Sequence, residues 1–291
     1  MVYESIKIQK DKSSMKRLFY RLLRKLGILK RVNINSSIKL NKKSIAIPIN
    51  GEIGFDNLDI SEPWMVEVLE SIDIGRGVFL DIGVNIGQTL IKVKSIYDEI
   101  EYIGFEPNSL CVSYVNRLIE INRWRDITIV PVGIMQESSI LSLEYYSDSS
   151  TDSSASLVPN YRQNSKIYKR ETIATFSVDR VKHLWKDKSI SVIKIDVEGA
   201  EMDVILSFKD IIKSDRPTLL VEILPIYEES NSKRLDNQIK IEEILSELDY
   251  TIYRVYKTED NQLKNFEEIN SIGIHGDLNW CDYIFSPTKI I

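Results

Sequence analysis

From residue 78 onward, short runs of Val, Ile and Leu alternate with longer segments of helical periodicity. Strands that are buried on both faces of a sheet have continuous apolar runs of this kind. The order predicts an α/β fold with a mostly parallel, doubly wound sheet and right-handed crossovers. The predicted strands are VFLDI, EYIGFE, ITIVPVGI, SVIKID and PTLLVEI, followed by YTIYRVY and WCDYIFS, the last of them antiparallel and near an edge.

The chain before residue 76 has a different pattern. Residues 37–60 predict short strands and turns. The segment DISEPWMVEVLESI predicts a helix with Ser61 as its N-cap and Pro63 in its first turn. We therefore divide the sequence into a helical arm over residues 1–32, an N-terminal extension over residues 33–75 and a main domain over residues 76–291.

The arm is strongly basic. It has ten Lys or Arg residues against Glu4 and Asp11, a formal charge of +8; because the whole chain carries −5, the remainder carries −13. We favour a helix that ends at Gly27 and packs its apolar stripe on the domain or on a second subunit, in a homo-oligomer. The alternative is peripheral contact with an anionic membrane surface. The stripe consists of Met15, Leu18, Phe19, Leu22, Leu23 and Leu26.

The composition argues against several classes of protein. A net charge of −5 gives no sign of a nucleic-acid partner. The two cysteines, Cys111 and Cys281, lack the spacing of a zinc site. They fit a reducing, cytoplasmic compartment, although a disulfide between them is the alternative. We expect no signal peptide, and no apolar run approaches the ~18 residues that span a bilayer.

A glycine turn follows the first predicted strand of the main domain. Asp81, Gly83, Asn85 and Gly87 form the pattern D-x-G-x-N-x-G. A dinucleotide fingerprint has glycine at the first of these positions. A carboxylate that points into the site disfavours a pyrophosphate, and so a nicotinamide-dependent oxidoreductase. It favours a cationic ligand such as S-adenosylmethionine. The alternative is that the two glycines serve only a tight turn and helix packing.

Two sets of acidic residues follow later strands. Glu106, 19 residues after Gly87, can accept both hydroxyls of a ribose, so the two motifs together predict a nucleoside-containing cofactor. The segment VIKIDVEGAE brings Asp196 and Glu198 to a strand end, near the reactive end of the cofactor. These acids could instead cap the next helix, which would fully explain Glu201.

A polar insertion interrupts the alternation. The segment SDSSTDSSASLVPN, residues 147–160, has the composition of a solvated loop. Long insertions near the carboxyl ends of strands can also form lids or substrate loops. The sequence leaves both interpretations open.

The motifs FLDIGVNIG, GFEP, VPVGI, SASL, FSVDRV, IKIDVEGAE and LLVEI occur in this order. Over residues 76–225 the chain thereby resembles the FkbM family of S-adenosylmethionine-dependent methyltransferases, although Val84 stands where the family usually has alanine. The resemblance implies a Rossmann-like class I methyltransferase fold with an antiparallel last strand. It also implies O-methylation, commonly of sugars in surface polysaccharides or of specialised metabolites. By position, the methionine end would lie at Asp81, Gly83 and Asn85, the ribose at Glu106 and Pro107, and the adenine near Val132 and Gly133.

A sugar hydroxyl is a weak nucleophile, so a base or a metal should assist it. Asp196, Glu198 and Glu222 are our main candidates; they could act as the base or hold Mg²⁺. His275, between Gly273 and Gly276, is a weaker candidate, and His183 is better explained as a surface or packing residue. We predict an O-methyltransferase that acts on a sugar hydroxyl of a surface glycan or a specialised metabolite. The alternative is a non-catalytic domain that binds a nucleoside or a partner chain.

Overall fold

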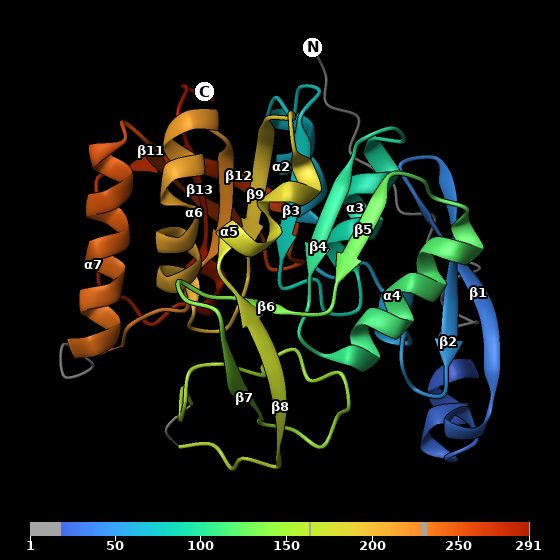
Figure 1. The fold of residues 1–291 in the computed structure, drawn as a ribbon. Coiled ribbons are helices and arrows are strands. Elements are labelled where there is room, and N and C mark those ends of the chain that lie inside the picture. The colour runs from blue at the N-terminus through green and yellow to red at the C-terminus, as the bar shows by residue number, and fades with distance from the viewer. Residues whose placement is uncertain (1–18, 163, 228–231, 291) are drawn as a thin grey trace.

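The computed structural model describes residues 19–162, 164–227 and 232–290, and its centre is an eight-stranded sheet of order β12-β11-β13-β10-β9-β3-β4-β5 (Figure 1). The five strands from β10 to β5 are parallel to one another, which confirms the predicted α/β class. The strands are β3 (Val78–Ile82), β4 (Tyr102–Phe105), β5 (Ile127–Val130), β9 (Ile190–Ile195), β10 (Thr218–Glu222), β11 (Thr251–Lys257), β12 (Leu263–Ile269) and β13 (Asp282–Ser286).

The last strand is antiparallel, as predicted, but it does not lie near an edge. β13 pairs with β10 on one side and β11 on the other. The edge is formed by β12, a strand that the sequence analysis did not predict and that pairs antiparallel with β11. The prediction failed because pairing between strands far apart in sequence decides which of them lies outermost.

Helices cover both faces of the sheet (Figure 1). Alternate strand residues explain this, because Phe79 packs in the apolar cluster of one face and Leu80 in that of the other. The first face is covered by α2 (Trp64–Ser71), α3 (Gln88–Ile96) and α4 (Ser109–Asn122). The second is covered by α5 (Val178–Val181), η3 (Lys182–Trp185), α6 (Glu201–Asp215) and α7 (Ser232–Glu247).

A smaller sheet lies beyond the carboxyl ends of the parallel strands, in the lower part of Figure 1. Its order is β6-β8-β7, with β6 (Gly133–Ile134), β7 (Ser139–Tyr145) and β8 (Lys169–Phe176). The polar insertion is the connection between β7 and β8. The small sheet therefore positions the insertion at the end of the central sheet where α/β proteins bind ligands.

The extension forms an antiparallel hairpin of β1 (Asn33–Leu40) and β2 (Lys43–Asn50), followed by η2 (Asp56–Leu58). Its buried face shares an apolar cluster with Ile91 of α3 and Leu118 of α4. Ser61 does not cap α2, because the helix begins after Pro63 and the Ser61 hydroxyl has no hydrogen-bond partner in the described chain.

Asn122, at the end of α4, fastens this hairpin to the domain. Its side-chain oxygen accepts the N–H of Ala46 at 2.8 Å, and its side-chain nitrogen donates to the Ala46 carbonyl at 2.8 Å. The amide thus satisfies both backbone groups of an edge residue of β2, as a neighbouring strand would.

The cysteines are both buried and free, so the disulfide alternative does not hold.

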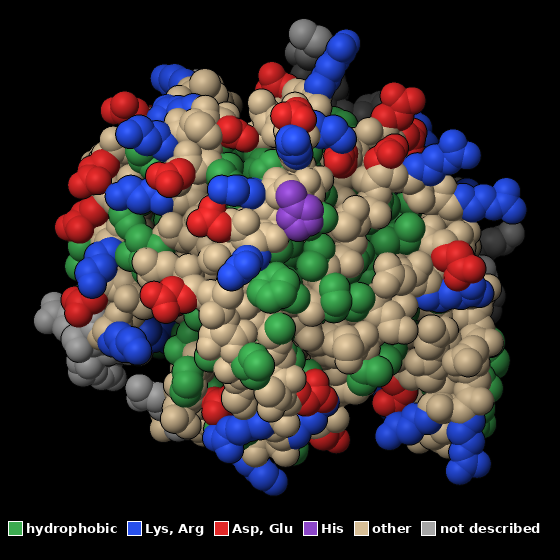
Figure 2. All heavy atoms as spheres, in the orientation of Figure 1, with side chains coloured by type: hydrophobic (Ala, Val, Ile, Leu, Met, Phe, Trp, Pro, Cys, Tyr) green, Lys and Arg blue, Asp and Glu red, His purple; other side chains and the backbone are tan. Residues whose placement is uncertain are grey.

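Within the described residues, no helix combines the length and the apolar character that crossing a membrane requires. On the face drawn in Figure 2, basic and acidic side chains are intermixed.

We predict that Asn122→Ala lowers the free energy of unfolding by about 2 kcal/mol, because two hydrogen bonds to the hairpin are lost. Urea denaturation would measure this, and hydrogen exchange at the Ala46 amide should accelerate. Asn265→Ala is the control, because it removes only the exposed hydrogen bond to Glu267 and should change stability by less than about 0.5 kcal/mol. Equal effects of the two substitutions would contradict the role of Asn122.

Candidate active site

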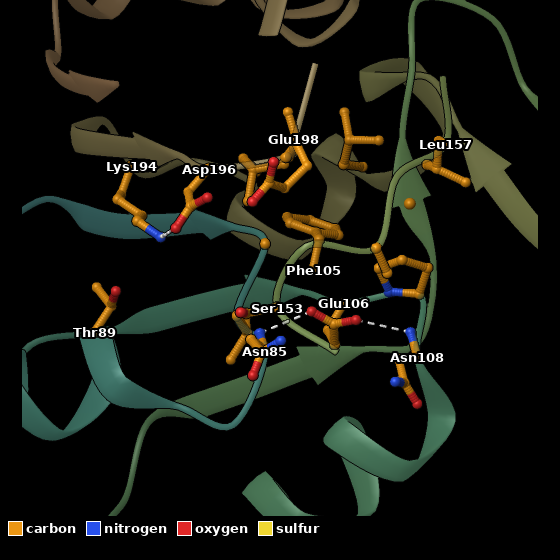
Figure 3. Close-up of a pocket in the computed structure, with 18 of the residues that line it drawn as sticks. Asn85, Thr89, Phe105, Glu106, Asn108, Ser153, Leu157, Lys194, Asp196 and Glu198 are labelled. Carbon is orange, nitrogen blue, oxygen red and sulfur yellow. Dashed lines mark hydrogen bonds and ion pairs between the residues drawn. The ribbon is translucent and has the colours of Figure 1, made fainter. Parts of the chain in front are cut away.

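A cavity of about 120 Å³ opens at the carboxyl ends of β3, β4 and β9, under the β7–β8 connection (Figure 3). Several of the predicted site residues line it, which brings together four separate motifs. These are Gly83, Asn85, Glu106, Pro107, Gly133, Asp196 and Glu198.

The turn after β3 is shaped by close backbone contact. Gly83 has φ +96°, and a Cβ there would lie 1.8 Å from the carbonyl oxygen of Asp196. Asn85 is also left-handed, at φ +46°. Gly87 does not line the cavity; a Cβ there would meet Val115 and Leu118 of α4 at 3.3 and 3.2 Å. Of the two glycines, only Gly83 lies where the backbone could come close to a ligand. Gly87 serves helix packing, which was the alternative interpretation for both glycines.

The carboxylate of Asp81 does not point into the cavity as we predicted. Its side chain is fully buried and accepts a hydrogen bond from the Tyr102 hydroxyl. Lys194 Nζ lies 3.8 Å from the other carboxylate oxygen. Burial raises the pKa of Asp81 to about 6, although Lys194 opposes that shift. Asp81 therefore supports the floor of the site through Lys194.

Glu106 does face the cavity, at the end of β4. Its two oxygens accept the backbone N–H groups of Asn85 at 2.7 Å and Asn108 at 2.8 Å (Figure 3). The side chain is only 6% exposed, and this burial raises its pKa to about 7. A carboxylate oxygen can accept more than one hydrogen bond, so Glu106 keeps acceptor capacity for ligand hydroxyls.

Apolar side chains form the part of the cavity beyond Glu106. Phe105, Ile134, Leu143 and Leu157 line it together with Gly133. Val132, the other predicted neighbour of adenine, does not line the cavity and is buried in the core. The result is a slot suited to a flat, weakly polar group.

At the opposite end, two carboxylates follow β9, each with its own cation. Asp196 lies 2.8 Å from Lys194 Nζ, and Glu198 lies 2.9 Å from Arg162. Burial and then Asp196 raise the pKa of Glu198 to about 7, against the opposing effect of Arg162. Glu201, the first residue of α6, accepts the N–H of Gly199 at 2.7 Å, so it fixes the turn that leads into the helix.

Glu222 lines a second, narrower cavity that shares Glu62, Lys194 and Asp196 with the first. At about 10 Å³ it has room for about one water molecule. Burial, together with the nearby Asp196 and Asp282, raises the pKa of Glu222 well above its usual value.

His275 is not among the described residues that line either cavity. Its Nε2 lies 3.1 Å from the Tyr283 hydroxyl, and its ring packs near Trp280. The structure therefore gives His275 a structural environment and no support for a catalytic role.

Glu62 was missed by the sequence analysis, although it lines both cavities. Its backbone is left-handed, at φ +49°, and its carboxylate lies 3.0 Å from Nζ of Lys92, which is 1% exposed. Burial alone would raise the pKa of Glu62, but Lys92, Lys194 and Lys257 outweigh it and lower the pKa. The available signal was Lys92 itself, a lysine within an apolar helix that needs a buried partner.

The polar insertion docks as a lid. Asp152 organises its start by accepting the N–H groups of Tyr146 and Ser147 at 2.7 and 2.8 Å. Asn108 donates to the Ser150 carbonyl at 2.8 Å, and the Ser156 hydroxyl donates to the Glu198 carbonyl at 2.6 Å. The loop is thereby tied to both sides of the cavity, so the solvated-loop interpretation does not hold.

Of the three carboxylates that we expected could hold Mg²⁺, Asp196 is engaged by Lys194 and Glu198 by Arg162 instead. Among the residues that the structure describes, no group of three or more His, Cys, Asp or Glu side chains is arranged to bind a metal ion. The donor set therefore gives no support to a magnesium site.

A family model described as the methyltransferase FkbM domain matches residues 81–255, which is more than half of the chain. The chain belongs to the FkbM methyltransferase family. This confirms the family that the ordered motifs resembled. Methyltransferase 1 of Beauveria bassiana is 25% identical over an alignment of 144 residues, and the match covers 45% of this chain and 58% of that protein.

Two solved structures are similar at low identity. Methyltransferase FkbM from Methylobacillus flagellatus is 17% identical with a TM-score of 0.46, over 72% of this chain and 43% of its own. The O-methyltransferase from Bacillus cereus in complex with SAH is 10% identical with a TM-score of 0.46, over 96% and 92%. The chain thus spans less than two thirds of the Beauveria and Methylobacillus proteins.

We predict that Gly83→Ala lowers the free energy of unfolding by about 3 kcal/mol, because left-handed strain and a clash with the Asp196 carbonyl add together. Gly273→Ala is the matched control, since Gly273 is also left-handed, at φ +70°, but a Cβ there meets nothing within 4 Å. It should cost about 1 kcal/mol, from strain alone. Equal losses in urea denaturation would show that the contact with Asp196 is unimportant.

We further predict that Arg162→Met speeds dissociation of S-adenosylmethionine from this FkbM enzyme about fivefold, because the lid loses its charged hydrogen bond to Glu198. A chase of labelled cofactor would give the rate. Lys182→Met removes an exposed ion pair with Asp179 on the α5–η3 segment and should leave the rate unchanged. An unchanged rate in Arg162→Met would rule out the lid contact as a barrier to release.

Proposed function

We propose that this FkbM methyltransferase transfers the methyl group of S-adenosylmethionine to a hydroxyl oxygen of a sugar, in a surface glycan or a specialised metabolite. The supporting observation is that one cavity joins an apolar slot and the Glu106 carboxylate to the carboxylates of Asp196 and Glu62. The first end fits a nucleoside, and the second fits a cationic donor next to a hydroxyl-bearing acceptor.

The donor fits the residues that line this cavity. Glu106 would accept hydrogen bonds from the ribose hydroxyls, and Phe105, Ile134 and Leu157 would enclose the adenine. Gly83 and Asn85 would lie along the methionine part, where a close backbone approach is needed. When bound, S-adenosylmethionine supplies an electrophilic methyl group on a positively charged sulfur.

Asp196 is our candidate for the base. It borders both cavities, and its side chain is 30% exposed. Glu198 is held by Arg162 under the lid, and the raised pKa of Glu222 favours its neutral form. Asp196 would orient the acceptor hydroxyl and take up its proton as the oxygen–methyl bond forms. Lys194 would fix the carboxylate in place.

Calorimetric titration of S-adenosylmethionine tests the donor half of this proposal. We predict that Glu106→Gln weakens binding at least about tenfold, because charge-assisted hydrogen bonds to the ribose are lost. Asp196→Asn should bind the donor within a few-fold of wild type. NAD should give no heat with any of the proteins. Binding that is insensitive to Glu106→Gln would contradict the ribose assignment.

The acceptor half is tested with methyl-labelled donor and a polysaccharide extract. After acid hydrolysis, the label should appear in O-methyl sugars with the wild-type enzyme and be lost with Asp196→Asn. Label in N-methyl or non-carbohydrate products would contradict the sugar assignment while leaving the donor site intact.

A further inference from the structure

The described end of the basic arm is a short helix over residues 19–25 that is held firmly against the protein. Tyr20 and Leu23 pack on the apolar cluster of the hairpin, and Leu29, just beyond the helix, is fully buried. Gly27 ends the helix in the left-handed conformation, as predicted, with Ile28 N–H bonded to the Leu23 carbonyl at 3.0 Å. The orientation of this helix is therefore fixed by packing.

Within the described residues, the side chains of the predicted apolar stripe do not all point the same way. Leu23 faces the protein, but Phe19, Leu22 and Leu26 are 56%, 54% and 61% exposed. These three lie at i, i+3 and i+7, so they share one side of the helix. The interpretation that the whole stripe packs on the domain is thus wrong for these residues; Met15 and Leu18 lie outside the described residues. A continuous apolar strip that is exposed to solvent marks a site of interaction with a partner.

Basic side chains flank this strip. Lys25 is exposed, and the side chains of Arg21 and Arg24 are 63% and 47% exposed. Their ion pairs with Asp59 and Asp56 are long, at 3.9 and 3.7 Å, and such exposed pairs are weak. The arguments for a lipid partner are this arrangement and the charge of +8 over residues 1–32.

We propose that residues 19–28 dock on an anionic membrane surface, with the apolar strip in the interface and the basic side chains at the level of the lipid headgroups. The helix lies at the end of the molecule that carries the lid, as the dark blue helix at the lower right of Figure 1 shows. Contacts support this placement. Arg24 stacks on Phe55, and the nearby Asn57 donates to the Ile86 carbonyl of the glycine turn at 2.8 Å. Docking there brings the active site close to the lipid surface.

Co-sedimentation of the full-length protein with lipid vesicles tests the proposal. We expect binding to vesicles of phosphatidylcholine mixed with phosphatidylglycerol, little binding to pure phosphatidylcholine, and weakening at high salt. Leu26→Glu should lower the partition coefficient at least about tenfold, because an apolar side chain leaves the interface and a negative charge enters it. Ile140→Glu is the matched control. Ile140 is 73% exposed on β7 and is not part of the helix, and its substitution should leave binding unchanged.

Three outcomes would overturn the proposal: wild-type protein that ignores anionic vesicles, Leu26→Glu that binds as well as wild type, or an equal loss in Ile140→Glu. A dimer in sedimentation equilibrium that Leu26→Glu dissociates, without vesicle binding by the wild type, would assign the strip to a second copy of the chain. Titration of S-adenosylmethionine into Leu26→Glu should match wild type, which separates a docking defect from a defective active site.

Discussion

The ammonium group of Lys194 is the interaction on which the site depends. It lies inside the sheet on β9, between the carboxylates of Asp81 on β3 and Asp196 after β9. Burial alone would lower the pKa of Lys194, but Asp196, Asp81 and Glu62 outweigh it and raise the pKa. An uncompensated buried charge costs several kcal/mol. The ammonium group of Lys194 and its carboxylates are therefore tolerated in the interior only because each compensates the charge of the other. The strand ends, the glycine turn and the Asp196 backbone are aligned around this group.

The alternation of strands and helices could be read from the sequence because each buried parallel strand is a continuous apolar run. The positions of β13 and β12 could not, because they depend on pairing between distant segments. The charged end of β12, with Glu267 and Glu268, also hides its strand character in the sequence. The local pattern thus predicted the strands and helices of the parallel core, and long-range pairing determined the order of the strands.

The same distinction applies to the site. Glu106, Gly83 and Asp196 were found because each follows a recognisable strand, and carboxyl ends of parallel strands meet at one edge. The direction of a side chain is decided by its neighbours in space. The Asp81 carboxylate points into the interior because it contacts Tyr102 and Lys194. Neither contact could be predicted from the local sequence. Glu62 was missed because its partner lies 30 residues away, on α3.

The position of Glu62 has a consequence for how the two ends of the pocket can change independently of one another. The match to the family model begins at residue 81, so Glu62, which borders both cavities as Asp196 does, lies outside it, in the segment that joins the hairpin to the sheet. At the other end of the chain, Asp282 of β13 lines the second cavity and also lies outside the matched region. The lining of the pocket is therefore divided along the chain: the region that matches the family model supplies the end that we propose for the donor, and the flanking segments supply part of the opposite wall. Substitutions in those flanking segments can reshape the opposite wall without changing any residue of the proposed donor end.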